Sequence, residues 1–326
     1  MGIERENRVV ALLGPTAVGK TDCSLKLAQQ FPFEIISSDS RLFYHGMDIG
    51  TAKPSLQERE RVPHFLIDVS PPTDPWSLQR YLQAARVVID EICSRGAMPL
   101  LVGGTGQYVT ALLEGWQPPP RPEDDSIRIS LEAFAEREGA QALHQRLQEV
   151  DPQRASELDP RNVRRVIRAL EIYESTGNSP SSYRKKTPPP YEILRIGLTM
   201  PREALYKRID QRIDQMIENG WINEVQALLD QSVPVESSTF SAIGYAQLAS
   251  YLRGEIPFDE ALIQIRRITR SFVRRQANWF KPDDPAIHWL PAGPQASEQA
   301  AALIKRWIAG EPLQDQEQDK QPGLDD

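Results

Sequence analysis

Short apolar runs with the character of buried strands recur along the first part of the chain. They occur at Val9 to Leu13, Glu34 to Ile36 and Leu100 to Val102, with a weaker run at Phe65 to Ile67. Segments with the 3.6-residue period of helices separate these runs. Strands that alternate with helices indicate a parallel sheet covered on both faces, so we predict an α/β fold.

Two proline-rich stretches enclose a region with a different pattern. Residues 117–122 contain four prolines, and proline continues neither a helix nor a central strand because it lacks the N–H donor. From about Asp124 to Gly177 the pattern is helical and polar, and a second proline run lies at residues 187–190. We therefore predict a helical insertion domain at residues 122–188, after a first core segment at residues 1–121.

After the insertion, the pattern of the core returns. Tyr191 to Thr199 predicts a strand, and two amphipathic segments follow, one ending at Leu229 and one from Phe258 to Phe280. We assign residues 189–312 to the helical C-terminal part of the core. Residues 313–326 have almost no apolar groups, which predicts a disordered tail.

Composition and charge exclude several classes of protein. With only Cys23 and Cys93 in 326 residues, the chain forms neither a disulfide framework nor a cysteine-based zinc site of the usual spacing. No apolar stretch approaches eighteen residues, so we expect a cytoplasmic protein. The net charge of −7 argues against a polyanionic partner, but salt screens charges over roughly 8 Å, and local arginine clusters can still bind phosphate.

One motif carries specific chemistry. The sequence GPTAVGKT at residues 14–21 fits GxxxxGK[ST], directly after a predicted strand and before a helical pattern. Its backbone N–H groups and the following helix N-terminus suit a diphosphate, Lys20 adds a mobile positive charge, and the Thr21 hydroxyl is placed to coordinate Mg²⁺. The candidate diphosphate-binding residues are Gly14, Pro15, Thr16, Ala17, Val18, Gly19, Lys20 and Thr21.

The motif predicts a P-loop NTPase-like parallel sheet core with a helical insertion domain, but it does not identify the transferred group. A merely tight strand-to-helix turn would leave Lys20 unexplained. A GTPase is disfavoured because no NKxD element follows a strand. The acidic Mg²⁺ ligand stays open at this point, since Asp39 and Asp68 both follow apolar stretches.

Several blocks in order along residues 8 to 290 resemble one family. They are GPTAVGKT (14–21), IISSDSRLFYHGMDIGTAKP (35–54), PHFLIDV (63–69), LLVGGTGQY (100–108), RRVIRALEIY (164–173), AIGYAQ (242–247) and RRQANWF (274–280). The chain is similar in these blocks to the tRNA dimethylallyltransferase family, bacterial type. The resemblance implies transfer of a dimethylallyl group from dimethylallyl diphosphate to the N6 amine of adenosine 37, next to the anticodon of tRNA. It also implies Mg²⁺ as cofactor, release of diphosphate and a monomer.

The same resemblance assigns catalytic roles. It makes Asp39 the general base on the N6 amine, and a carboxylate that accepts this proton should help by roughly 10² to 10⁴. The alternatives for Asp39 are a helix N-cap or a second Mg²⁺ ligand. Thr105 resembles the family residue near the leaving-group oxygen, although its GGTG loop can also be only a turn. Lys20 completes the catalytic set.

Arginines supply the remaining candidates. Arg208 and Arg212 share a helix face and by resemblance reach the diphosphate, or else form a solvated cluster with Asp210 and Asp214. Arg164, Arg165 and Arg168 form one basic stripe in the insertion. Arg267, Arg270 and Arg274 form a second, and each stripe either contacts RNA or is a solvated face. The residues that the resemblance assigns to tRNA are Asp39, Ser40, Arg41, Leu42, Thr105, Arg164, Arg165, Val166, Ile167, Arg168, Gly244, Tyr245, Arg274 and Arg275.

Two aromatic residues and three other functions stay open. Tyr245 and Trp279 either stack on bases or lie in the core. An adenylate isopentenyltransferase would use the same donor with a free nucleotide as acceptor. A small-molecule kinase would use the insertion as a lid, and a non-catalytic RNA-binding protein would not need Asp39.

Overall fold

The computed structural model describes residues 7–120, 124–235, 237 and 239–313. The chain divides into two compact units, each described by itself below. The core unit comprises Met1–Trp76, Gln83–Thr110 and Pro190–Asp326, and the helical unit comprises Ser77–Leu82 and Ala111–Pro189. The tail predicted at residues 313–326 lies outside the described residues apart from its first position.

Within the described part of the core unit, six strands form one parallel sheet in the order β3-β2-β4-β1-β5-β6. Their bounds are β1 (Arg8–Leu13), β2 (Phe33–Ser37), β3 (His64–Phe65), β4 (Met98–Val102), β5 (Glu192–Thr199) and β6 (Ile287–Pro291). The prediction of an α/β fold with a parallel sheet is confirmed. The pattern did not indicate β6, a five-residue strand that extends the sheet beside β5.

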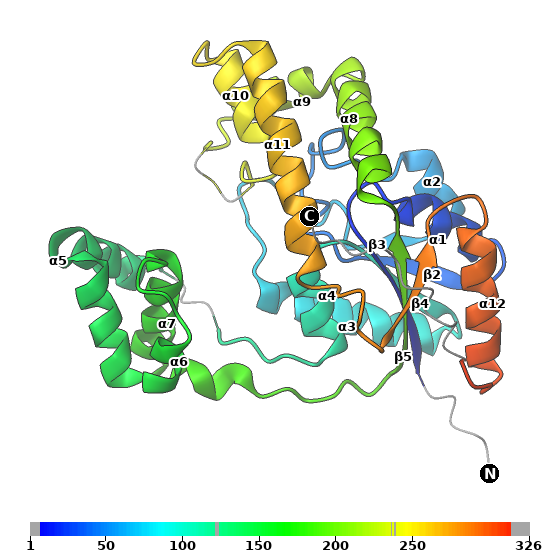
Figure 1. Ribbon diagram of the computed structural model, residues 1–326, viewed down its shortest axis with the longest axis horizontal. Helices are drawn as coiled ribbons and strands as arrows, with labels where there is room; N and C mark the ends of the chain where they lie inside the picture. The colour runs from blue at the N-terminus through cyan, green and yellow to red at the C-terminus, as the bar shows by residue number, and fades with distance from the viewer. Residues whose placement is uncertain (1–6, 121–123, 236, 238, 314–326) are drawn as a thin grey trace. The chain divides into compact units, whose positions relative to one another are not determined.

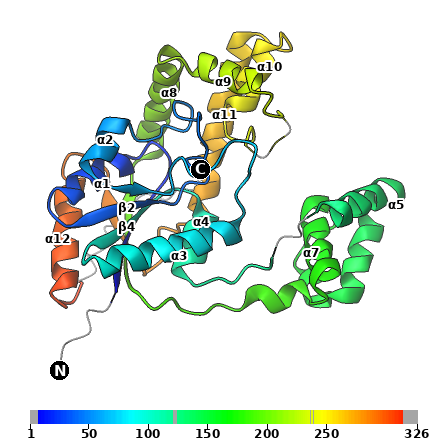
Figure 2. The ribbon, with the colours of Figure 1, turned by 180° about the vertical axis from the view of Figure 1, so that it is seen from behind.

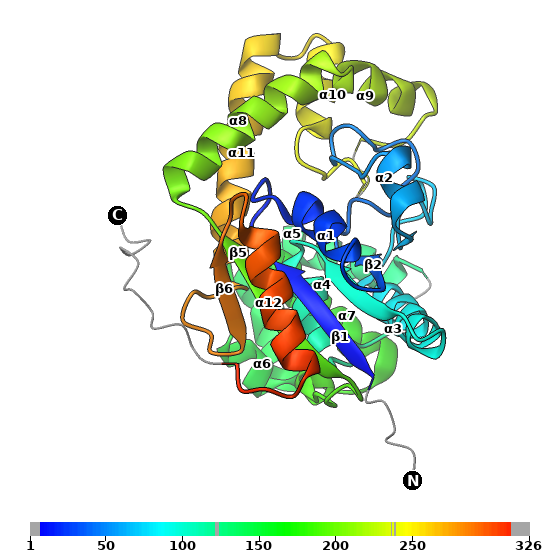
Figure 3. The ribbon, with the colours of Figure 1, turned by 90° about the vertical axis from the view of Figure 1, so that its right-hand side faces the viewer.

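Helices cover both faces of this sheet. Those of the core unit are α1 (Lys20–Ala28), α2 (Leu56–Arg61), most of α3 (Leu78–Ser94), the first part of α4 (Gly106–Leu113), α8 (Arg202–Glu218), α9 (Trp221–Asp230), α10 (Tyr245–Leu252), α11 (Phe258–Ala277) and α12 (Ala296–Ile308). α1 and α12 pack together on one face, and α3 and α4 lie on the other (Figures 2 and 3). Parallel strands need crossover connections, and helical crossovers place helices on the faces of the sheet.

The helices α8 to α11 extend from the carboxyl end of the sheet (Figure 1). The amphipathic segment predicted to continue to Leu229 is two helices, because Gly220 adopts a left-handed φ of 95° between α8 and α9. Asp210 and Asp214 of α8 form ion pairs with Arg266 and Arg270 of α11. These pairs fix which face of α8 turns toward α11.

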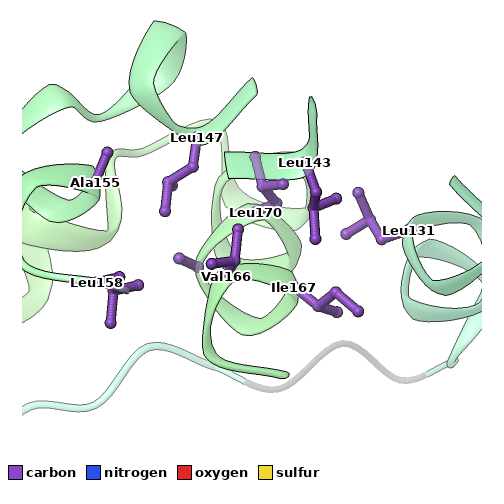
Figure 4. Close-up of a cluster of buried hydrophobic side chains, with 9 residues drawn as sticks. Leu131, Leu143, Leu147, Ala155, Leu158, Val166, Ile167 and Leu170 are labelled. Carbon is purple, nitrogen blue, oxygen red and sulfur yellow. The ribbon is translucent and has the colours of Figure 1, made fainter. Parts of the chain in front are cut away.

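The helical unit contains α5 (Ser126–Val150), α6 (Pro152–Ser156), α7 (Val163–Thr176) and a short 3₁₀ helix, η1 (Pro180–Arg184). Leucine, isoleucine, valine and alanine side chains from the three α-helices, with Leu158 from the segment between α6 and α7, form its own buried cluster (Figure 4). α5 is interrupted at Gly139, whose φ of 87° is not helical. Glu171, only 1% exposed, accepts ion pairs from Arg128 of α5 and Arg168 of α7, which ties these helices together.

Candidate active site

The loop between β1 and α1 holds the GPTAVGKT residues. Gly14 has φ 139° and Gly19 has φ 109°, and a Cβ on Gly14 would lie 2.6 Å from the carbonyl oxygen of Leu198. Both positions favour glycine because of their positive φ, and Gly14 also excludes any side chain by its close approach to Leu198. α1 begins directly after Gly19 and no side chain caps it, so its first N–H groups can face an anion.

Lys20 lies folded against this loop. Its Nζ donates to the carbonyl oxygens of Gly14 at 2.9 Å and Pro15 at 2.8 Å. Burial lowers the pKa of Lys20 to about 8; Asp39 acts against this shift and Arg212 adds to it. Among the described residues no carboxylate forms an ion pair with Lys20, so an anion at the loop would supply a charged partner.

The loop opens into a cavity of about 530 Å³ at the carboxyl end of the sheet. Parallel α/β sheets bind ligands at this end. Several of the predicted site residues line this cavity, although they lie far apart in the sequence. They are Thr16, Ala17, Gly19, Lys20, Thr21, Asp39, Leu42, Arg208 and Arg212. The fold therefore brings the P-loop, the loop after β2 and one face of α8 together.

Two arginines of α8 form the cationic wall of this cavity. The Arg208 guanidinium lies 3.7 Å from where a Cβ on Gly19 would be. Burial lowers the pKa of Arg212, Asp39 raises it, and Arg208 lowers it further. Asp210 and Asp214 pair with α11 instead, so the solvated cluster considered for Arg208 and Arg212 is not what the structure contains. Neither guanidinium forms an ion pair with another described residue, and such groups beside a P-loop are suited to a diphosphate.

Asp39 follows β2 in a turn. Its Oδ1 accepts the backbone N–H of Arg41 at 3.0 Å, which is an Asx turn. The N-cap alternative for Asp39 is wrong, because the next helix is α2, and Ser55 caps it with a complete capping box. Its carboxylate lines the cavity that also contains Lys20 and Arg212.

The GGTG loop lies directly beside Asp39. Thr105 Oγ1 accepts the backbone N–H of Ser40 at 3.2 Å. A Cβ on Gly103 would come within 2.6 Å of the Ser38 backbone, so the loops after β4 and β2 are in close contact. Thr105 is thus more than a turn residue, since its hydroxyl orients the segment that contains Asp39.

One residue that the sequence analysis did not single out links two of these loops. Gln276, at the end of α11, is 3% exposed. Its Oε1 accepts the N–H of Thr16 at 3.0 Å, and its Nε2 donates to the carbonyl of Gly104 at 2.7 Å. The available signal was an uncharged polar residue in the arginine-rich RRQANWF block.

The segment after Asp39 is held by α9. The Glu224 carboxylate accepts the backbone N–H groups of Asp48, Ile49 and Gly50 at 2.6, 2.7 and 3.1 Å. It also accepts the hydroxyl of Tyr245 at 2.6 Å. Glu224 was likewise not predicted, because nothing in the local pattern of α9 indicates its distant partners.

Tyr245 is fully buried and packs edge-on against Trp221, so it belongs to the core. Its assignment as a base-stacking residue is wrong. Burial raises the pKa of Tyr245 well above its usual value, and the neighbouring Glu224 carboxylate adds to this shift. Gly244 is also structural, because a Cβ there would come within 2.1 Å of Trp221. Trp279 is 40% exposed, and its ring lies against Gly106.

Asp68, the second acidic candidate for a metal, is already paired. It accepts hydrogen bonds from Lys53 at 2.5 Å and Arg59 at 2.7 Å. Burial alone would raise the pKa of Asp68, but the two cations outweigh burial and hold it below its usual value. Among the residues that the structure describes, no three His, Cys, Asp or Glu side chains converge to hold a metal.

Thr21 and Asp39 are the predicted residues whose oxygens could meet a metal, and they line the cavity together with other oxygen-bearing side chains such as Asp22 and Glu58. Mg²⁺ takes oxygen ligands, keeps several waters and needs only one or two protein groups when substrate phosphates complete its shell. This donor set fits Mg²⁺ at the edge of the P-loop.

The RNA candidates in the helical unit have different environments. Val166 is 0% exposed and Ile167 is 4% exposed, and both lie in the hydrophobic cluster. The prediction that their side chains contact RNA directly is therefore wrong. Arg168 donates to buried Glu171 at 2.8 Å. Arg164 and Arg165 are exposed in the first turn of α7, and no ion pair joins either to another described residue.

The second basic stripe lines a groove of about 430 Å³ along α11, formed by Ile263, Arg266, Arg267, Arg270 and Arg274. Arg266 and Arg270 are engaged by α8. Arg274 contacts Ser271, and the guanidinium of Arg275 lies over the ring of Phe272. The arginines along this groove therefore serve two purposes. Arg266 and Arg270 form ion pairs that brace α8 against α11, whereas no carboxylate of a described residue pairs with Arg274 or Arg275.

No helix among the described residues is long and apolar enough to cross a membrane.

Residues 42–283 match the family model described as IPP transferase, and residues 7–70 match the one described as isopentenyl transferase. The tRNA dimethylallyltransferase of Roseiflexus sp. (strain RS-1) is 47% identical over 304 residues, which cover 92% of this chain and 98% of that protein. That of Symbiobacterium thermophilum is 44% identical over 92% of this chain and 94% of its own length.

Solved structures agree with these relatives. The crystal structure of the full-length tRNA isopentenylpyrophosphate transferase from Bacillus halodurans is 40% identical, covers 93% of this chain and 96% of its own, and has a TM-score of 0.68. A eukaryotic dimethylallyltransferase, described as acting on tRNA, is 28% identical, covers 97% of this chain and 82% of its own, and has a TM-score of 0.83. With these matches over almost its whole length, the chain belongs to the IPP transferase family.

Proposed function

We propose that this protein transfers a dimethylallyl group from dimethylallyl diphosphate to the N6 amine of an adenosine next to the anticodon of tRNA, at position 37. The observation that carries the proposal is the cavity that joins P-loop, Asp39 and the α8 arginines. Its cationic wall suits a diphosphate, and the Asp39 carboxylate on its lining suits a base. Membership of the IPP transferase family supports the same reaction.

The donor diphosphate would lie on the N–H groups of the P-loop, with Lys20, Arg208 and Arg212 around it. These cations stabilise the negative charge that grows on the diphosphate oxygen as the bond to the prenyl carbon breaks. The Thr21 hydroxyl would hold Mg²⁺, which neutralises diphosphate when bound. Lys20 leaves the loop carbonyls to meet this anion, because a charged acceptor is the stronger partner.

The adenosine amine would attack beside Asp39. A C–N bond forms at the prenyl carbon, the C–O bond breaks, and its electron pair leaves with diphosphate. The amine proton passes to the Asp39 carboxylate, which is suited to accept it because the Arg41 N–H engages Oδ1 and no described residue donates a hydrogen bond to Oδ2. Thr105 orients this segment through Ser40 and lies near the leaving oxygen in the proposed complex.

For the RNA, we propose phosphate contacts in both units. Arg164 and Arg165 in the helical unit, and Arg274 and Arg275 on α11, are the exposed cations that support this assignment. The segment Ser40, Arg41 and Leu42 would face the anticodon loop, because it follows the proposed base. Proteins read single-stranded loops by extruding bases, and flipping the target adenosine costs a few kcal/mol that such phosphate contacts offset. The protein would act as a monomer.

The test follows label from dimethylallyl diphosphate, with and without Mg²⁺, into an unmodified anticodon stem-loop and, separately, into AMP. Label on the stem-loop alone, dependent on Mg²⁺, is the expected result. Label on AMP alone would replace the proposal with an adenylate isopentenyltransferase. Transfer to neither acceptor, together with release of ADP from ATP in the presence of a small hydroxyl compound, would establish a kinase instead.

A further inference from the structure

The side chain of Gln276 joins the two loops that would hold the donor. The P-loop follows β1 and the GGTG loop follows β4, and these strands are neighbours in the sheet. Gln276 comes from α11, 260 residues after Thr16 and 172 after Gly104, and its amide spans the space between the loops. With 3% exposure it is shielded from water, so both hydrogen bonds lie in an environment where losing either is costly.

The chemistry of both partners requires an amide at this position. Thr16 presents an N–H donor and Gly104 presents a carbonyl acceptor, so the bridging group must accept from one loop and donate to the other. A primary amide carries both functions at one end of one side chain, whereas a carboxylate only accepts. Methionine has nearly the same shape as glutamine but makes neither strong hydrogen bond.

Gly104 has no side chain because the amide fills the space beside it. A Cβ on Gly104 would come within 2.4 Å of Gln276 Nε2, while its next contacts, Gly14 O at 3.4 Å and Lys20 Nζ at 3.5 Å, leave ordinary room. The φ of Gly104 is not in the left-handed region, so the backbone itself tolerates alanine. An alanine at residue 104 would therefore act mainly by displacing the glutamine.

We propose that Gln276 is a positioning residue that fixes the donor-binding P-loop against the GGTG loop and, through it, against Asp39. The hydrogen bonds run from Thr16 to Gln276, from Gln276 to Gly104, and from the Ser40 N–H to the adjacent Thr105 hydroxyl. This inference rests on the proposed function. The prenyl carbon and the amine must be held in a reactive geometry, and a misplacement of about 1 Å can cost 10²-fold in rate.

The main variant is Gln276→Met. We expect kcat to fall about 10- to 100-fold, with a rise in KM for dimethylallyl diphosphate and unchanged affinity for the stem-loop. The matched control is Gln264→Met on the same helix, where the amide only reaches Glu260 one turn away, and this variant should behave as wild type. Gln276→Glu should be at least as impaired as Gln276→Met, because its carboxylate would oppose the Gly104 carbonyl.

A double-mutant cycle that includes Gly104→Ala separates a positioning role of Gln276 from a general effect of packing. If alanine acts by expelling the amide, Gly104→Ala and Gln276→Ala should each reduce kcat, and the double variant should be no slower than the slower single variant. Multiplying losses in the double variant would overturn the proposal, as would a wild-type kcat for Gln276→Met. A lower kcat that merely follows a loss of folded protein by circular dichroism would also overturn it. If wild type itself transfers no label, the proposed function fails rather than this inference.

Discussion

Two helices, one from each unit, carry closely spaced arginines and use them differently. On α8, Arg208 and Arg212 line the cavity beside the P-loop, while the aspartates of the same helix pair with α11. On α7, Arg168 is bound to Glu171, a buried carboxylate that also takes Arg128. The spacing of arginines along a helix is similar in both cases. An arginine that has a buried carboxylate beside it, as on α7, stabilises the fold. An arginine whose neighbouring carboxylates pair with another helix, as on α8, is left to face a ligand.

The largest effect that follows from this comparison concerns the cavity. Asp39→Ala should reduce turnover by about 10² to 10⁴, because the amine proton loses its acceptor, while stem-loop affinity stays largely unchanged. Single-turnover transfer of label and filter binding measure the two quantities. Asp230→Ala is a matched control, since that exposed aspartate lies outside the cavity lining and accepts a hydrogen bond from Gln226 on α9. An equal loss of binding and rate would contradict a role restricted to chemistry.

The corresponding change in the helical unit acts on stability. Glu171→Ala should destabilise that unit by about 2 to 3 kcal/mol, because Arg128 and Arg168 lose a buried partner although both still reach water. Hydrogen exchange of the α5 and α7 amides would measure the loss locally. Glu174→Ala breaks only the surface pair with Arg146 and should cost less than about 1 kcal/mol. Similar values for both variants would show that Glu171 does not brace these helices.

A smaller effect distinguishes the arginines of α7. Arg165→Ala should weaken stem-loop binding several-fold and reduce the slope of log affinity against log salt by about 1, because one phosphate contact is lost. Arg161→Ala is the control, since Arg161 is paired with Asp159 at 2.6 Å. Titrations of a labelled stem-loop at several salt concentrations supply both numbers. An unchanged slope for Arg165→Ala would assign this residue to the solvated face of α7.

The smallest expected effect is a pH dependence of the helical unit. Burial alone would raise the pKa of Asp151, but hydrogen bonds from Arg154 N and from Ser181 outweigh it and hold the pKa low. The stabilisation is therefore present above the unfolded-state pKa near 4 and is lost as pH falls through the lower folded-state value.

Exchange of the α6 amides at pH 5 and pH 2.5 would measure this dependence. Asp151→Asn should exchange faster than wild type at pH 5, and the difference between the two proteins should shrink in acid. A constant difference across this range would contradict the sign of the shift.

Local patterns predicted much of the core. The runs at Val9 to Leu13 and at Tyr191 to Thr199 became β1 and β5, and the GPTAVGKT residues form the turn between β1 and α1. These features depend on residues that are close together in sequence. They are the pattern of apolar residues in each strand, a glycine at a left-handed turn, and the start of a helix. β6 was not predicted, because its five residues gain their strand conformation by pairing with β5, far earlier in the chain.

The sequence by itself determined an α/β chain with a phosphate-binding loop, and its motifs indicated the family. Only the tertiary structure decided that Tyr245 is a core residue, that Asp68 is paired with Lys53 and Arg59, and that Glu224 and Gln276 hold the loops around the cavity. The physical reason is the same in each case. The residues that bury a side chain or hydrogen-bond to it lie either more than a hundred positions away in the sequence or in loops that come close only after folding. The local pattern of apolar and polar residues therefore does not predict these contacts.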